Sequence, residues 1–127
     1  MIVMIDDGKN ITKAIEATCR LTNDAFHAFP SYAEFAFWMI EGDILLSSDD
    51  YLLLDNTIEG EGLLIESLFT DSFWAANLWR MKDAKIFLHT ADLNMTMEIN
   101  VLRDVGLMAY HLIKGKHDLR DILPKAA

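Results

Sequence analysis

The chain has 127 residues, the usual size of one domain with one core, and residues 1–127 are expected to form a single domain. Its formal net charge is −9, from 20 acidic and 11 basic residues, with no run of Lys or Arg. A surface of this sign repels a phosphate backbone, so no nucleic-acid partner is expected. No apolar run is long enough for a membrane span, so no membrane association is expected either.

Cysteine usage and the first residues indicate the compartment. The one cysteine, Cys19, cannot form a disulfide within the chain or a cysteine-based zinc site. The opening residues form a short apolar run followed by two aspartates, without the basic flank and cleavage region of a signal or transit peptide. Both observations favour a reducing, cytoplasmic location.

Short apolar runs alternate along the chain with longer stretches of helical period. This alternation predicts βαβ units and a parallel sheet covered by helices on both faces, which is a three-layer α/β sandwich. Five segments are predicted as strands: 2–5, 25–29, 51–54, 85–89 and 107–113. Segment 44–46 is ambiguous between the start of the third strand and a loop.

Helical periodicity fills most of the chain between these strands. Ser31 is the expected N-cap of the second helix, because Glu34 follows it in the position of a capping box. Gly106 is expected just after the end of the fourth helix. Segment 56–62 contains two glycines and is expected to be a loop. Helices are predicted at 10–21, 31–42, 63–81 with a break near 70–72, 96–105 and 118–123.

Polar residues stand where four of the apolar runs stop. Asp6 and Asp7 follow the first strand, Asp55 the third, Thr90 the fourth and Lys114 the fifth. In open parallel sheets, sites lie beyond the carboxyl ends of the strands. We therefore expect these five residues to meet at one edge of the sheet.

These residue types suit a particular chemistry. Three carboxylates at one place repel one another unless a cation binds or a proton is taken up. Oxygen ligands without His or Cys favour Mg²⁺ over zinc. Lys114 offers a positive charge to an anion, and Thr90 offers a hydroxyl donor. The set suits a transferred phosphoryl group, whose charge has to be neutralised from several directions.

The order of these motifs resembles the response-regulator receiver domain of the CheY-like superfamily, from Met1 to Leu123. The resemblance implies a five-stranded parallel sheet with strand order 2-1-3-4-5, a flavodoxin-like arrangement. The motifs that carry it are Asp6-Asp7, Leu54-Asp55, Thr90-Ala91 and Lys114.

The resemblance also implies a role for each acidic residue. Asp55 would be the phosphoacceptor in a phosphorelay of two-component signal transduction. Asp7 and Asp55 would bind Mg²⁺ directly and Asp6 through water, with the backbone carbonyl of Thr57 as a further ligand. A sensor histidine kinase or phosphotransfer protein would supply the phosphoryl group.

Two further residues complete the implied site. Thr90 would bond a phosphoryl oxygen, and Lys114 would pair with Asp55 or its phosphate. The chain would then be a stand-alone phosphoprotein that signals to an output protein by contact, or as a homodimer, and not an enzyme beyond autodephosphorylation.

Departures from the receiver pattern motivate an alternative function. Ile58 is followed by Glu59 where the pattern has a proline, and Lys114 is followed by glycine instead of proline. The aromatic switch position is occupied by His111. The first alternative is therefore a degenerate receiver that binds partners independently of phosphorylation, with Trp74 and Trp79 of a long segment 71–81 as a candidate partner surface.

A second alternative rests on a second resemblance. Segment 86–91 together with Asn94 is similar to a receiver-derived family proposed to process cyclic phosphates, in which a histidine precedes the small hydroxyl residue of the fourth strand. His89 and Asn94 would then join the site, and the chain would be a metal-dependent cyclic phosphoester hydrolase.

Overall fold

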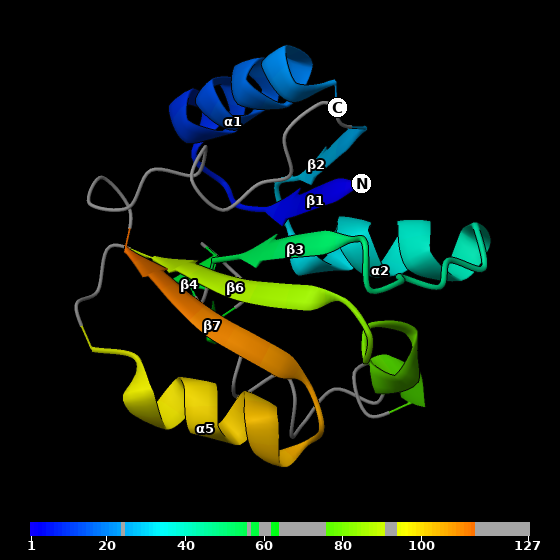
Figure 1. Ribbon diagram of the computed structural model, residues 1–127, viewed down its shortest axis with the longest axis vertical. Coiled ribbons are helices and arrows are strands. Elements are labelled where there is room, and N and C mark those ends of the chain that lie inside the picture. The colour runs from blue at the N-terminus through cyan, green and yellow to red at the C-terminus, as the bar shows by residue number, and fades with distance from the viewer. Residues whose placement is uncertain (24, 56, 59–61, 64–75, 91–93, 114–127) are drawn as a thin grey trace.

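The computed structural model describes residues 1–23, 25–55, 57–58, 62–63, 76–90 and 94–113. Five strands form one parallel sheet in the order β2-β1-β3-β6-β7, which is the predicted order 2-1-3-4-5 (Figure 1). The fold class inferred from the sequence is therefore confirmed. The strands are β1 (Ile2–Ile5), β2 (Phe26–Phe29), β3 (Tyr51–Leu54), β6 (Lys85–Thr90) and β7 (Met108–Ile113).

The residues of the central strands alternate between two hydrophobic clusters, one on each face of the sheet. On one face, Met4 and Leu53 lie in a cluster with Ile15 and Cys19 of helix α1 (Lys9–Thr22). The other face packs against α2 (Tyr32–Glu41) and α5 (Thr96–Asp104), whose buried residues include Phe35 and Leu102. Burial on both faces explains why these strands are continuous apolar runs.

Local signals fix the ends of two helices. The hydroxyl of Ser31 accepts a hydrogen bond from the backbone N–H of Glu34 at 3.2 Å, as predicted, and so sets the start of α2. Gly106 follows the C-cap of α5 with a φ of +92°, and its N–H donates to the carbonyl of Arg103 at 2.9 Å. The next N–H, of Leu107, donates to the carbonyl of Leu102 at 3.1 Å, which completes a Schellman motif.

The segment after Asp55 differs from the prediction. A short antiparallel hairpin joins β4 (Thr57–Ile58) to β5 (Gly62–Leu63), where the sequence predicted a loop and then a helix starting at Leu63. The prediction that a helix starts at Leu63 was wrong, because the backbone of Leu63 pairs with that of Thr57. The β-branched pair Thr57–Ile58 favours extended backbone, which the prediction of a loop did not take into account.

Two other segments lie near the amino ends of the strands. Segment 44–46 is a loop, and the buried Leu46 donates its backbone N–H to the carbonyl of Arg80 at 2.9 Å. The predicted helix 63–81 ends in a 3₁₀ turn, η1 (Leu78–Arg80), which carries the exposed Trp79. Some of the predicted features lie outside the described residues. They are segment 64–75 with Trp74, the predicted helix 118–123 and Lys114.

In the part of the chain that the structure describes, no helix combines the length and apolar character that crossing a membrane requires.

Candidate functional site

The carboxyl ends of β1 and β3 bring the three predicted aspartates together. Ile5 pairs with Leu54 in the register of these neighbouring strands, so the next residues, Asp6 and Asp55, leave the sheet side by side. The backbone N–H of Asp55 donates to the carbonyl of Ile5 at 2.9 Å and extends the ladder to this point. One carboxylate oxygen from each of Asp6, Asp7 and Asp55 lies within 4.8 Å of the others.

The three carboxylates differ in exposure. The side chains of Asp6 and Asp55 are buried, with residues 5% and 9% exposed, whereas Asp7 faces solvent. Burial of a carboxylate is costly unless hydrogen bonds or a cation compensate it. The two buried carboxylates of this cluster therefore need compensation by hydrogen bonds or by a cation.

Hydrogen bonds hold the backbone and side chains of this cluster in place. Asp6 accepts the backbone N–H of Gly8 on one carboxylate oxygen at 2.8 Å, which turns the chain into α1. From the other side, the buried hydroxyl of Tyr32 donates to the backbone carbonyl of Asp55. Tyr32 is the first residue of α2, so the Ser31 cap also fixes this contact. Sequence reasoning missed Tyr32, because no pattern links it to a residue 23 positions away.

The donor set fits a Mg²⁺ ion. All the grouped ligand atoms are carboxylate oxygens, the type that this hard cation prefers. Neighbouring ligands of an octahedral Mg²⁺ lie about 3 Å apart and opposite ligands about 4.2 Å apart, given bonds of about 2.1 Å. The observed limit of 4.8 Å is close to this spacing, so small side-chain rotations or a bridging water would accommodate the ion.

Strand β6 adds two buried polar residues to the same edge. Leu54 pairs with Leu88, so His89 lies level with Asp55 on the adjacent strand, and Thr90 follows it. Neighbouring strands run about 4.8 Å apart, which places the backbones of these residues next to the cluster. His89 is 3% exposed and Thr90 is 5% exposed.

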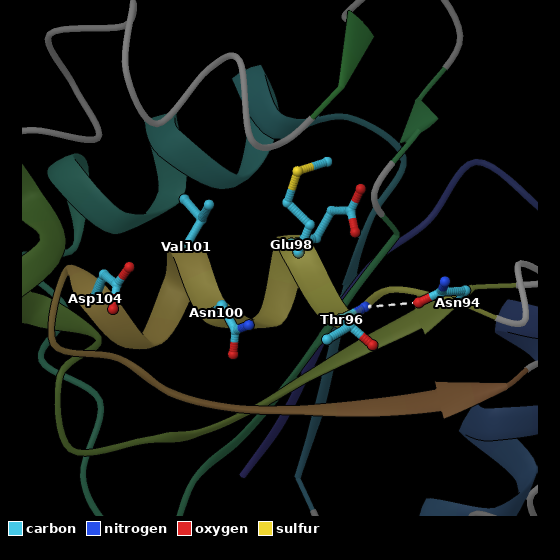
Figure 2. Close-up of a pocket in the computed structure, with 7 residues that line it drawn as sticks. Asn94, Thr96, Glu98, Asn100, Val101 and Asp104 are labelled. Carbon is cyan, nitrogen blue, oxygen red and sulfur yellow. Dashed lines mark hydrogen bonds between the residues drawn. The ribbon is translucent and has the colours of Figure 1, made fainter.

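The remaining predicted residues are placed only in part. Thr57 begins β4 two positions after Asp55, and its carbonyl as a metal ligand stays a prediction. Lys114 lies outside the described residues, one position after the last residue of β7. Asn94 lies at the start of α5, where its side-chain oxygen accepts the backbone N–H of Thr96 at 3.2 Å (Figure 2).

Two pockets lie at or near these residues. A pocket of about 340 Å³ opens beside Asp6 and Asp7, where Lys9 and Lys13 of α1 face the end of β2. A second pocket, of about 580 Å³, runs along α5 and is lined by Asn94 and by residues of that helix, including Glu98 and Asp104 (Figure 2). Only the first of these two contains residues of the carboxylate cluster.

Comparisons with known proteins bear on the fold. No family model matches the chain, and no curated protein matches it in sequence. Among solved structures, the chain is similar to a response regulator from Colwellia psychrerythraea. The match covers 90% of this chain and 83% of that one, with a TM-score of 0.51 at 12% identity. Together with the strand order and the flanking helices, this similarity shows that the chain has the fold of a response-regulator receiver domain.

Proposed function

We propose that the chain is a single receiver domain that accepts a phosphoryl group on Asp55 in a Mg²⁺-dependent reaction. The observation that carries this proposal is the meeting of Asp6, Asp7 and Asp55 at the carboxyl edge of a receiver-type sheet. The donor would be a sensor histidine kinase or phosphotransfer protein in the cytoplasm. The phosphorylated domain would then signal by contact with an output protein.

Each residue of the site would have its own role in this reaction. One carboxylate oxygen of Asp55 attacks phosphorus, a P–O bond forms, and the bond to the donor breaks. Asp6, Asp7, Asp55 and the carbonyl of Thr57 would hold Mg²⁺, whose charge would offset that of the phosphoryl oxygens. Thr90 donates its hydroxyl to one of those oxygens, and Lys114 supplies a cation. Tyr32 fixes the backbone of Asp55 by its hydrogen bond to the carbonyl.

The test is phosphorylation by a small phosphodonor, measured by intact-protein mass. We expect one phosphoryl group to be added when Mg²⁺ is present and none when the metal is chelated. Asp55→Asn should abolish the addition, because an amide cannot form the acyl phosphate. Asp83→Asn, at an exposed position in the turn before β6, is the matched control and should be phosphorylated like the wild type. Addition that persists in Asp55→Asn would refute the proposal.

Two observations on His89 favour a second candidate function. Its side chain is buried, and it lies level with Asp55 on the adjacent strand. An imidazole beside a metal-bound phosphate could move a proton during ester hydrolysis. The chain would then be a metal-dependent hydrolase of cyclic phosphoesters. This candidate predicts turnover of cyclic phosphate esters that His89→Gln abolishes while phosphorylation of Asp55 by a small donor persists. Absence of turnover across a panel of such esters would remove it.

A further inference from the structure

Strand β2 forms one edge of the five-stranded sheet and pairs with β1 on its inner side (Figure 1). The backbone N–H groups of Ile2 and Asp6 donate to the carbonyls of Ala25 and Phe29, at 2.8 and 3.1 Å. Alternate residues of a strand direct their backbone groups to opposite sides, so residues 25, 27 and 29 face β1. The backbone N–H and C=O groups at positions 26 and 28 therefore point away from the sheet.

The two edges of the sheet differ in how far their backbone groups are used. Between described residues, no hydrogen bond outside the β1–β2 ladder involves the backbone of Phe26 or Ala28. Ala28 and its neighbour His27 are exposed, so the middle of this edge is open to solvent. On the opposite edge strand, β7, the Nε–H of Arg103 donates to the carbonyl of Ala109 at 3.0 Å. A side chain of α5 thus occupies part of the β7 backbone, whereas the outward groups of β2 remain available.

The sequence of β2 lacks the features that usually protect an edge strand. Edge strands often carry a charged side chain, a proline or a bulge, which prevents other strands from pairing with them. Segment 25–29 reads Ala-Phe-His-Ala-Phe and contains no acidic residue, lysine, arginine or proline, although 24% of the chain is charged. It pairs with β1 in regular register from Phe26 to Phe29, without a bulge. This edge is therefore an uncharged, regular strand that can accept another strand.

The outward groups of β2 are complementary to a second copy of the same strand. When Phe26 lies opposite Ala28 of an antiparallel second copy, the two residues exchange both of their N–H···O bonds, and the twofold axis repeats this pair. The side chains of Phe26 and Ala28 lie on the α1 face, so each ring meets a small exposed alanine, which borders the pocket between α1 and β2. His27 then stands at the axis, opposite His27 of the second copy.

We propose that the chain forms a homodimer by antiparallel pairing of β2 with β2 of a second copy, which joins the two sheets into one. The inference does not depend on phosphorylation of Asp55. Aromatic side chains flank the axis on the α2 face, where the ring of Trp38 lies 5.2 Å from that of His27 and 5.1 Å from that of Phe29. Burial of these rings between the two copies adds apolar area to the backbone hydrogen bonds.

A cysteine at the axis tests the register of the pairing. In a non-hydrogen-bonded antiparallel pair the Cα atoms are about 4.5 Å apart, which is within the range of a disulfide. The single cysteine of the chain, Cys19, is buried. We expect His27→Cys to form a disulfide-linked dimer under mild oxidation at least about tenfold faster than Ala14→Cys, because pairing raises the effective concentration of the two thiols. Ala14 is the control because it is exposed on α1 and does not line the pocket beside β2. Non-reducing electrophoresis measures both rates.

Two substitutions of Ala28 test the contribution of the edge itself. Ala28→Pro removes an outward N–H that β1 does not use, so the ladder within the chain is kept. Ala28→Lys places a charge on the apolar edge, and Ala14→Lys adds the same charge on α1 as its control. We expect both Ala28 variants to weaken dimerisation at least about tenfold and Ala14→Lys to dimerise like the wild type. Sedimentation equilibrium measures the dimer at physiological salt, which screens the repulsion between two copies of net charge −9.

Circular dichroism establishes which variants are folded, and Ala28→Lys decides the question if Ala28→Pro does not fold. A wild type that stays monomeric at every concentration would overturn the inference. So would a dimer that persists in the folded Ala28 variants, because its interface would lie elsewhere on the molecule. Equal rates of disulfide formation in His27→Cys and Ala14→Cys would overturn the register.

Discussion

At the scale of single residues, Tyr32 connects a helix to the acceptor loop. Its hydroxyl is buried and donates to the backbone carbonyl of Asp55. Tyr32→Phe keeps the ring and removes the donor, so a buried carbonyl loses a hydrogen bond. We expect the free energy of unfolding, measured by urea denaturation, to fall by about 1–2 kcal/mol. Phosphorylation of Asp55 should slow as well, because the backbone of the acceptor is held less firmly.

The control for Tyr32 is a tyrosine on the last strand of the sheet that is far more exposed. Tyr110 on β7 is 40% exposed, and Tyr110→Phe should change the free energy of unfolding by less than about 0.5 kcal/mol. If the two variants lost equal stability, the hydrogen bond of Tyr32 would have no special importance.

The residues of the candidate site were predictable to different degrees. Asp6, Asp7 and Asp55 could be found because each follows an apolar strand, and parallel strands deliver their carboxyl ends to one edge. Tyr32 could not, because its approach to the site depends on how α2 packs on the sheet. Packing of this kind is a tertiary property that local periodicity does not encode.

At the scale of elements, the end of α5 allows a clean test of backbone conformation. Gly106 has a φ of +92°, a region that residues with a Cβ rarely adopt, and the added Cβ of an alanine would meet no atom within 4 Å. Gly106→Ala should therefore lower the free energy of unfolding by about 1–2 kcal/mol through backbone strain alone. The measurement is urea denaturation, with the exposed helical position Asn100→Ala as the control.

If Gly106→Ala had the same free energy of unfolding as the wild type, the residue after α5 would not need the left-handed conformation. Asn100→Ala should be neutral or slightly stabilising, because alanine favours a helix more than asparagine does.

Helices and strands were predicted best where the hydrophobic pattern and the capping residues indicated the same boundaries. The strand 51–54 and the helix starting after Ser31 match β3 and α2, because burial and the N-cap point to the same boundaries. The hairpin of β4 and β5 was missed, since two glycines near Thr57 and Ile58 suggested a loop. Two-residue strands are stabilised by pairing with each other and leave almost no pattern in the sequence.

At the scale of the whole molecule, the sheet order joins segments that are distant in the chain. β3 lies between β1 and β6, so the edge that carries Asp6 and Asp55 also carries His89 and Thr90. The acidic cluster sits in a protein whose net charge is −9, which raises the electrostatic cost of three adjacent carboxylates. A bound cation would offset this cost and stabilise the native state in proportion to its affinity.

The most direct measurement of the central claim is a calorimetric titration with Mg²⁺, because every proposed step depends on a shared site of Asp6, Asp7 and Asp55. We expect the wild type and Asp83→Asn to bind one Mg²⁺ with equal affinity. Asp7→Asn should reduce the affinity at least about tenfold, through loss of a charged ligand. Binding to Asp7→Asn as tight as to the wild type would contradict the account.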